Sequence, residues 1–376
     1  MSTLAVDAIV DSSNGNTTTI NGATPTAYNT MGKNRIINGA MEIDQRNAGA
    51  STAVSSTTQY MLDRWRAIEI TDGGFSVERS TTAPAGYTNS MKFTITSADT
   101  SLAAGQLSGF DQFIEGYNAA DLGFGTANAK TVTLSFWVRS SLTGTFSGAL
   151  RNSATNRTYI FTYAISAADT WEYKTITVAG DTSGTWLTDN GIGINVIWSF
   201  GTGTDWQGTA GSWSASGAFS TSGSVSLIGT NGATFYITGV QLEVGSVATE
   251  FERRLYGTEL QLCQRYYYQM NCYGTGSDNF YGRFVGIAET GTNVIFSMFW
   301  PSGEMRTTPT ASYSGSLRMD DYYSANNPAG TFTSGNLTKW GGILQVSVAS
   351  GSFTQGRTIR LLMNSSVGSL NFSAEL

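Results

Sequence analysis

Two tryptophans stand in a stretch of the chain that otherwise consists mostly of glycine, serine, threonine and alanine. The stretch TGTDWQGTAGSWSASG covers residues 202–217 and contains Asp205, Trp206, Gln207 and Trp213. A flat apolar ring beside amide and carboxylate groups suits a sugar, which is apolar on its C–H face and hydroxylated at its edge. These four residues are therefore candidates for carbohydrate binding. The alternative is that one or both tryptophans cover the end of a hydrophobic core.

A second stretch, RMDDYYSANNPAG over residues 318–330, gathers acidic, tyrosine and asparagine side chains. Tyrosine and asparagine are adaptable contact residues in binding loops. The candidates for receptor or glycan contact here are Asp320, Asp321, Tyr322, Tyr323, Asn326 and Asn327. The alternative interpretation is the end of a strand followed by a turn.

Catalytic chemistry has little support in this composition. The chain contains no histidine, which excludes Ser-His-Asp and Cys-His catalysis and histidine-bound zinc or iron. A glycosidase needs only two carboxyl groups, and the available acids are Glu115, Asp121, Asp278, Asp320 and Asp321. Surface or turn positions explain most of these acids more simply. We expect no catalysis and no cofactor, and the sequence leaves open a structural calcium ion.

Charge excludes further classes of function. Only 13% of the 376 residues are charged, against about 25% in average proteins, and the net charge is −6. No basic stripe exists to follow a phosphate backbone, so we expect no nucleic-acid partner. No apolar run of about 18 residues exists, and the N-terminus lacks the basic start of a signal peptide. We expect a protein made in a cytoplasm and not inserted in a membrane.

Short strands account for most of the chain. Between residues 34 and 255, runs such as FSVER, MKFTITS and TVTLSFWVRSS alternate with Asn-Gly, Asp-Gly and other glycine turns. This pattern predicts one jelly-roll-like β-sandwich. Trp65, Trp137, Trp171 and Trp198 lie inside strand runs and are predicted to be core residues. Residues 274–376 contain further strand candidates and predict a second, C-terminal β-sandwich.

One helix is predicted between these two β units, over residues 256–273. Thr258 can cap its N-terminus with Gln261 completing a capping box, and Gly274 can end it. The residues Leu260, Cys263, Tyr267 and Met270 recur at helical spacing and form one stripe. We predict a connecting helix whose stripe, with Tyr267 inward and Tyr266 and Tyr268 at its flanks, packs on its own sandwich or around a three-fold axis.

Residues 1–33 read as an arm that is too small to hold its own core. It carries Asn-Gly turns between short apolar runs, and its apolar positions include Leu4, Val6, Ile9 and Ile20. Such an arm needs another subunit or a larger assembly as its partner. The alternative is an unstructured terminus.

Several stretches resemble tail-fibre and receptor-binding proteins of tailed bacteriophages, in the same order over most of the chain. They are NRIINGAMEIDQR (34–46), DRW (63–65), LSFWVRSSLTGTFSGAL (134–150), TWEYKTITVAGDTSGTW (170–186), VQLEVGSVATEFERR (240–254), LCQRYYY (262–268), MRTTPT (305–310) and AEL (374–376). One departure is Leu255, where the family pattern leads us to expect proline. This departure puts the domain boundary before the helix in doubt.

The resemblance implies an adhesin that is attached to the virion through its N-terminal arm, with Leu4, Val6, Ile9 and Ile20 as attachment candidates. It implies a homotrimer whose sandwich is similar to carbohydrate-binding modules and whose distal β domain (274–376) faces the host. The matched motifs are assigned scaffold roles and no ligand contacts. We therefore expect a non-enzymatic tail fibre that binds a host surface polysaccharide. The alternatives are a purely structural tail or baseplate component and a polysaccharide depolymerase.

Overall fold

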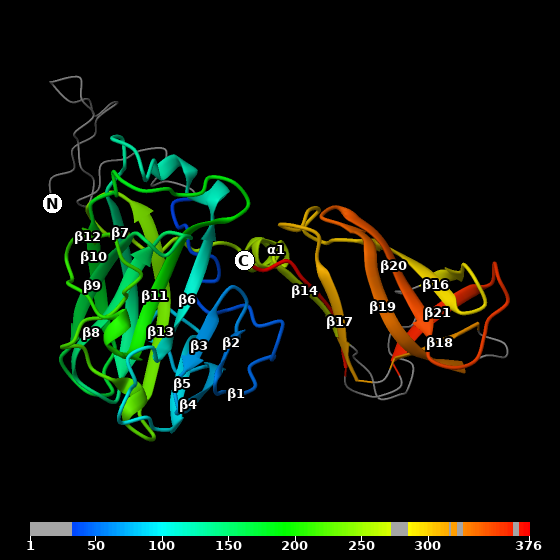
Figure 1. Ribbon diagram of the computed structural model, residues 1–376, viewed down its shortest axis with the longest axis horizontal. Coiled ribbons are helices and arrows are strands. Elements are labelled where there is room, and N and C mark those ends of the chain that lie inside the picture. The colour runs from blue at the N-terminus through cyan, green and yellow to red at the C-terminus, as the bar shows by residue number, and fades with distance from the viewer. Residues whose placement is uncertain (1–31, 272–284, 316, 322–325, 364–367) are drawn as a thin grey trace, which may run out of the picture. The chain divides into compact units, whose positions relative to one another are not determined.

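The structure is a computed structural model that describes residues 32–271, 285–315, 317–321, 326–363 and 368–376 (Figure 1). The chain divides into two compact units, Met1–Arg254 and Leu255–Leu376. Each unit is built almost entirely from antiparallel strands, as the alternating sequence predicts. The attachment candidates Leu4, Val6, Ile9 and Ile20 lie outside the described residues.

The first unit is a sandwich of two sheets. The six-stranded sheet has the order β1 (Thr52–Val54), β4 (Gly74–Ser80), β5 (Ser90–Ser97), β13 (Thr234–Val244), β7 (Val132–Ser140) and β10 (Glu172–Val178). The seven-stranded sheet has the order β12 (Trp213–Ser214), β9 (Thr158–Ile165), β8 (Gly144–Arg151), β11 (Ile192–Thr202), β6 (Leu107–Glu115), β3 (Arg66–Ile70) and β2 (Thr57–Tyr60). Four short 3-10 helices lie in the connections: η1 (Gly116–Asn118), η2 (Ala120–Leu122), η3 (Thr204–Trp206) and η4 (Leu227–Gly229). The predicted all-β, jelly-roll-like sandwich is confirmed.

An aromatic core fills the space between the two sheets. Trp198 stacks on Phe110 with ring centroids 5.1 Å apart, and Phe110 stacks on Phe93 at 4.7 Å. Trp65 and Trp198 are fully buried here, as predicted. Because side chains alternate along a strand, the neighbours of core residues point to the outer faces. Those outer faces carry the features that matter for function.

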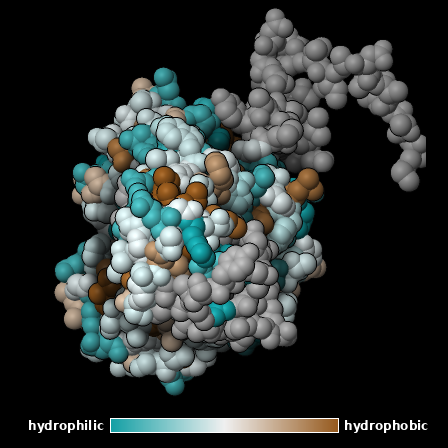
Figure 2. All heavy atoms as spheres, turned by 90° about the vertical axis from the view of Figure 1, so that its right-hand side faces the viewer, coloured by the Kyte–Doolittle hydropathy of each residue, from teal (hydrophilic) through white to brown (hydrophobic). Residues whose placement is uncertain are grey.

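The outer face of the seven-stranded sheet holds a smaller hydrophobic cluster of its own. Its members are Ile68, Leu107, Ala149, Ile160, Ile197, Ala218 and Phe219. The segment after β11 folds back over the sheet and supplies Ala218 and Phe219. On the face of the molecule drawn in Figure 2, hydrophobic residues form small groups among hydrophilic and near-neutral ones. That pattern agrees with a chain that is polar through uncharged residues.

The second unit begins with α1 (Tyr256–Gln264) and combines a small sheet with a closed barrel. The sheet has the order β14 (Tyr267–Asn271), β22 (Ser369–Ser373) and β17 (Thr310–Ser314). The barrel has the order β15 (Val285–Ala288), β16 (Asn293–Phe299), β20 (Gly341–Val348), β19 (Asn326–Thr338), β18 (Leu317–Asp320) and β21 (Thr358–Met363). The barrel closes because β21 pairs with both β15 and β18, whereas the sequence predicted a C-terminal β-sandwich. Two register shifts in β19 help the sheet to bend.

The predicted helix is shorter than its spacing suggested. It begins after Leu255, so Thr258 lies inside its first turn and does not cap it, and it ends at Gln264. Tyr267 and Met270 lie on β14, which pairs with β22 near the C-terminal end of the chain. The single helical stripe from Leu260 to Met270 is therefore wrong, because backbone pairing with a distant strand outweighs a local spacing. No helix among the described residues is long and apolar enough to cross a membrane.

The burial of Tyr266, Tyr267 and Tyr268 differs from the prediction, which turned only Tyr267 inward. Tyr266 is fully buried and Tyr267 nearly so, with the Tyr267 hydroxyl 2.7 Å from Gln269 Oε1. Tyr268 and Met270, on the other face of β14, pack against the core of the second unit. Cys263 is buried and forms no disulfide. These contacts lie within the second unit and give this segment a structural role there.

Candidate functional site

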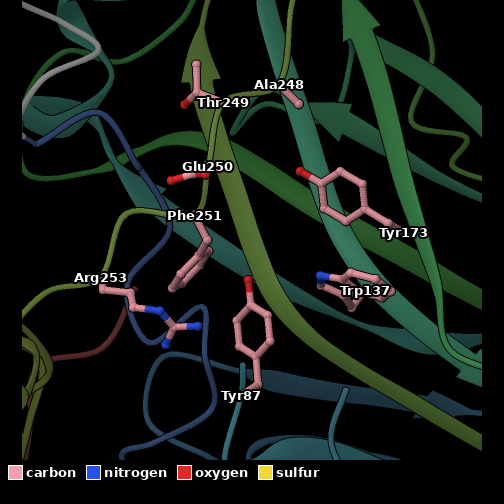
Figure 3. Close-up of a pocket in the computed structure, with 8 residues that line it drawn as sticks. All are labelled: Tyr87, Trp137, Tyr173, Ala248, Thr249, Glu250, Phe251 and Arg253. Carbon is pink, nitrogen blue, oxygen red and sulfur yellow. The ribbon is translucent and has the colours of Figure 1, made fainter. Parts of the chain in front are cut away.

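A pocket of about 570 Å³ lies on the outer face of the six-stranded sheet. Its lining consists of Tyr87, Trp137, Tyr173, Ala248, Thr249, Glu250, Phe251 and Arg253. Figure 3 shows Trp137 and Tyr173 on one side, Phe251 and Arg253 on the other, and Tyr87 between them. The volume lies within the roughly 300–1,000 Å³ range of small-ligand pockets. Aromatic rings and a few polar groups face the same space.

One wall comes from two neighbouring strands. Trp137 on β7 and Tyr173 on β10 are direct cross-strand partners, and their ring centroids lie 5.3 Å apart. Phe136 and Val138, on either side of Trp137, are fully buried in the core. Alternation therefore turns Trp137 outward, where it is only partly buried. The prediction that Trp137 is a core residue is wrong. The same holds for Trp171, just before β10, which is also only partly buried.

Tyr87 lies between the two walls, and its ring packs against the backbone of Gly239. It comes from the loop between β4 and β5, and its hydroxyl lies 2.6 Å from the place that a Cβ on Gly239 would occupy. Gly239 has a φ of +62° and sits at a register shift in β13. Both the positive φ and the close approach require glycine at this position. Burial raises the pKa of Tyr87 to about 12, so its hydroxyl stays protonated at neutral pH.

The opposite wall is formed by Phe251 and Arg253. The Phe251 ring meets Tyr87 edge-on with centroids 5.5 Å apart. The Arg253 guanidinium lies 4.8 Å from the centre of the Tyr87 ring and donates a hydrogen bond to the Gly86 carbonyl. Guanidinium stacked on an aromatic face keeps its outer N–H groups available for a ligand. Glu250 adds a carboxylate at the rim.

Residues 245–254, which we call the strap, run from the end of β13 and hold this wall in place. The Glu243 carboxylate accepts bonds from the backbone N–H of Thr249 at 2.8 Å and from its hydroxyl at 2.6 Å. Lys33 donates to the Thr249 hydroxyl at 2.5 Å, and the Gln241 side-chain oxygen accepts from the backbone of Glu252 at 2.8 Å. The strap is thus fixed by side chains from β13 and from the start of the described chain.

The strap is also tied to the segment that precedes the first strand. Glu252 accepts backbone hydrogen bonds from Gly32 at 2.5 Å and from Asn34 at 2.8 Å. Arg254 donates to the Asn34 carbonyl and, at 3.1 Å, to that of Ile36. Alternate residues of the strap therefore anchor it, while Phe251 and Arg253 face the pocket. A pre-formed wall reduces the entropy lost on binding.

The tryptophans of the first predicted site have packing partners. Trp206 lies in η3, packs on Phe219 at 6.0 Å and donates its indole N–H to the Gly105 carbonyl at 3.0 Å. Trp213 lies on β12, meets Trp186 at 5.4 Å and donates to the Ala179 carbonyl at 2.7 Å. Both side chains are partly buried, as in the alternative of a covered core.

The polar neighbours of Trp206 differ in what they contact. Gln207 donates its side-chain amide to the Thr202 carbonyl at 2.9 Å, whereas Asp205 is exposed. None of the four predicted residues lines the pocket described above. Their binding role stays a prediction.

In the second predicted site, the two aspartates, which the structure describes, both form ion pairs. Asp320 accepts two hydrogen bonds from Arg360 at 2.8 Å each, and Asp321 pairs with Arg357 at 2.9 Å. Asn326 and Asn327 lie at the start of β19. Tyr322 and Tyr323 lie outside the described residues. The two aspartates therefore form ion pairs with arginines of the same barrel unit.

The acids considered for glycosidase chemistry are also engaged or buried. Asp121 pairs with Arg35 at 2.9 Å, and Glu115 is buried on β6, while Asp278 lies outside the described residues. No group of three or more histidine, cysteine or acidic side chains that could hold a metal ion occurs in the described part of the chain. Among the described residues that line the pocket, Glu250 is the only acid.

No protein-family model matches the chain. No curated protein matches it either. Solved structures that resemble it include a CBM4 structure, with 15% identity, a TM-score of 0.27 and coverage of 55% of this chain and 98% of the other. A family 11 carbohydrate-binding module of a Clostridium thermocellum cellulase has 10% identity, a TM-score of 0.27 and coverage of 54% and 100%. The enzymatically active domain of tailspike protein 4 of bacteriophage CBA120 has 12% identity, a TM-score of 0.29 and coverage of 56% and 21%. At such TM-scores these likenesses carry no argument about function.

Proposed function

We propose that the protein is a non-enzymatic adhesin that binds a cell-surface glycan in the pocket formed by Trp137, Tyr173, Tyr87, Phe251 and Arg253. The observation that carries this proposal is the convergence of four aromatic rings with a guanidinium and hydroxyl groups in one open pocket. The rings offer flat faces to the C–H side of a sugar, and the polar groups reach its hydroxyls. The hydrogen bonds of the strap hold Phe251 and Arg253 in place before a ligand binds.

The proposal moves the glycan contact from the second unit to the first. The sequence favoured the distal β domain because of its Tyr, Asp and Asn residues. There, however, Asp320 and Asp321 are neutralised by Arg360 and Arg357. The first unit instead presents Trp137 and the rings around it to an open space. We therefore assign recognition to the first unit.

The test removes one wall of the pocket in the full-length protein. The Trp137→Ala/Tyr173→Ala variant should bind host surface polysaccharide at least about 30-fold more weakly, because central aromatic anchors are worth about 2 kcal/mol. Trp171→Ala is the matched control, since it removes a partly buried tryptophan next to β10 that does not line the pocket. Unchanged affinity in the double variant, or an equal loss in the control, would refute the pocket assignment.

The biological setting rests on the resemblance to phage tail fibres. We propose a virion tail protein, made in the host cytoplasm, that attaches to tail or baseplate proteins through residues 1–33 and assembles as a homotrimer. Three copies would raise apparent affinity by around 10² to 10⁴ without new contacts. A mass measurement in solution tests the trimer, and a monomer would contradict it. Immunogold labelling of the phage tests the location.

Two other functions are tested separately. Incubation with host polysaccharide should release no reducing ends, and any oligosaccharide product would favour a depolymerase. Excess full-length protein should block phage adsorption to cells. If saturating protein neither binds polysaccharide nor competes with the phage, a purely structural tail component is the better description.

A further inference from the structure

Arg253 brings an accessible positive charge into the aromatic pocket. The residue is exposed, and no carboxylate among the described residues forms an ion pair with it. One of its N–H groups binds the Gly86 carbonyl, and its Cζ lies 4.8 Å from the centre of the Tyr87 ring and 5.8 Å from that of Phe251. A guanidinium has five N–H donors and stays charged at neutral pH. Most of these donors are therefore open to a ligand, while the group itself is already held in position.

The pocket offers more hydrogen-bond donors than acceptors. The Trp137 indole N–H and the Arg253 guanidinium can only donate, whereas the hydroxyls of Tyr87 and Tyr173 can donate and accept. Figure 3 shows the Trp137 nitrogen and the Tyr87 hydroxyl directed into the space between the walls. Neither group has a hydrogen-bond partner in the described part of the chain. Such a lining favours a ligand rich in acceptors, and a carboxylate accepts bonds roughly twice as strong as those of neutral groups.

The Glu250 carboxylate at the rim does not neutralise Arg253. Both residues are exposed, and Figure 3 shows the Phe251 ring between the carboxylate and the guanidinium. The structure describes both side chains and forms no ion pair between them. The backbone carbonyl of Glu250 accepts a bond from Lys33 at 2.7 Å, so this residue also helps to fix the strap. The two charges thus lie at separate points of the pocket wall, and the guanidinium is open to an anion.

We propose that the sugar bound in this pocket is acidic and that Arg253 binds its carboxylate while the sugar ring stacks on Trp137 and Tyr173. This inference rests on the proposed glycan-binding function and adds to it the chemical class of the sugar, a uronate. A planar carboxylate matches the two-pronged donor edge of a guanidinium. The same pairing occurs within this protein, where Arg66 and Asp111 are joined by two bonds of 2.9 and 2.6 Å.

The test compares glucuronate and galacturonate with their methyl esters, which keep the sugar ring and lose the negative charge. In calorimetry, full-length wild type should bind each acid about fivefold more tightly than its ester, the gain that an ion pair at an open site can supply. In Arg253→Gln this preference should disappear, because the ester loses little and the acid loses its charged partner. Arg253→Lys keeps the charge without the two-pronged edge and should retain only part of the preference.

Two variants serve as controls. Arg79→Gln is the matched one, because Arg79 also donates to a backbone carbonyl, that of Glu42 at 2.6 Å, and does not line the pocket. It should keep the full preference for the acids. Glu250→Gln should keep or increase that preference, because it removes a negative charge from the rim.

The possible failures of the uronate assignment and of the pocket can be told apart. Equal binding of acids and esters by wild type, or a preference that survives in Arg253→Gln, overturns the uronate assignment. An equal loss for acids and esters in Arg253→Gln also overturns it, because Arg253 would then act only by packing on Tyr87. If wild type binds host polysaccharide through Trp137 and Tyr173 but neither acid, the uronate assignment fails alone. If it binds neither the polysaccharide nor the acids, the proposed function fails with it.

Discussion

Replacement of Gly239 by alanine tests how the pocket is built. At this position φ is +62°, and an added Cβ would lie 2.6 Å from the Tyr87 hydroxyl oxygen and 2.7 Å from the ring carbon that bears it. The left-handed backbone alone costs a non-glycine residue about 1–2 kcal/mol. Real Cβ atoms do not approach neighbours this closely, so Tyr87 must swing away from β13.

The displacement of Tyr87 adds a second loss. Its edge-to-face contact with Phe251 is worth about 0.5–1.5 kcal/mol, and the Arg253 guanidinium over its ring about 0.5–1 kcal/mol. Together with the backbone strain, we expect Gly239→Ala to lower the free energy of unfolding by roughly 2–4 kcal/mol. It should also weaken glycan binding, because Tyr87 leaves its place between the two walls.

A double-mutant cycle separates the two losses. In a Tyr87→Ala background the clash is absent, so Gly239→Ala should lower stability only by the backbone strain of about 1–2 kcal/mol. Gly232→Ala is the matched control, because Gly232 has a φ of +77° with no atom within 4 Å of its added Cβ. Guanidinium unfolding followed by tryptophan fluorescence reports mainly on the first unit, which holds every tryptophan except Trp300 and Trp340. Strictly additive losses, or a loss no larger than that of Gly232→Ala, would refute the reasoning.

Three further outcomes follow from other parts of the structure. Burial raises the pKa of Tyr87 to about 12, and that of Tyr163 also rises, so the folded state holds these protons more tightly than the unfolded state does. Stability should therefore be fully present below pH 10 and fall as pH rises toward 12, less steeply in Tyr87→Phe, in pH-dependent denaturant titrations. Cys263, which is fully buried, should resist a thiol reagent until the protein unfolds, as followed by peptide mass spectrometry. Asp320→Asn should lower the stability of the second unit by about 1.5–3 kcal/mol, measured by calorimetry, because Arg360 loses a charged partner.

The class of fold was predictable because each strand has a local sequence pattern, in which buried and outward-facing residues alternate between turns. Alternation of core residues such as Phe136 and Val138 with outward residues, interrupted by glycine and asparagine turns, was enough to predict a sandwich. The second unit was harder for a physical reason. Barrel closure depends on the pairing of β21 with both β15 and β18, and such long-range pairing leaves no local mark in the sequence.

The helix shows the same limit at smaller scale. Spacing from Leu260 to Met270 satisfied a helical pattern, yet the residues from Tyr267 onward pair as a strand with β22. Tyrosine has a high preference for strands, so three consecutive tyrosines were a signal that favoured the observed outcome. A pattern of a few apolar residues cannot decide between two elements when the deciding hydrogen bonds come from the other end of the domain.

The sequence did not predict the pocket for a different reason. One segment of the chain contains both structural residues and pocket-lining residues. The stretch VATEFERR was assigned a scaffold role, and Glu252 and Arg254 do hold the strap to the start of the sandwich. The residues that alternate with them, Phe251 and Arg253, point the other way and line the pocket. Alternation along an extended strap thus lets one segment serve both purposes, just as it turns Trp137 outward between two core residues. An aromatic residue inside a strand pattern should therefore be assigned to core or site only after asking what covers the outer face of its sheet.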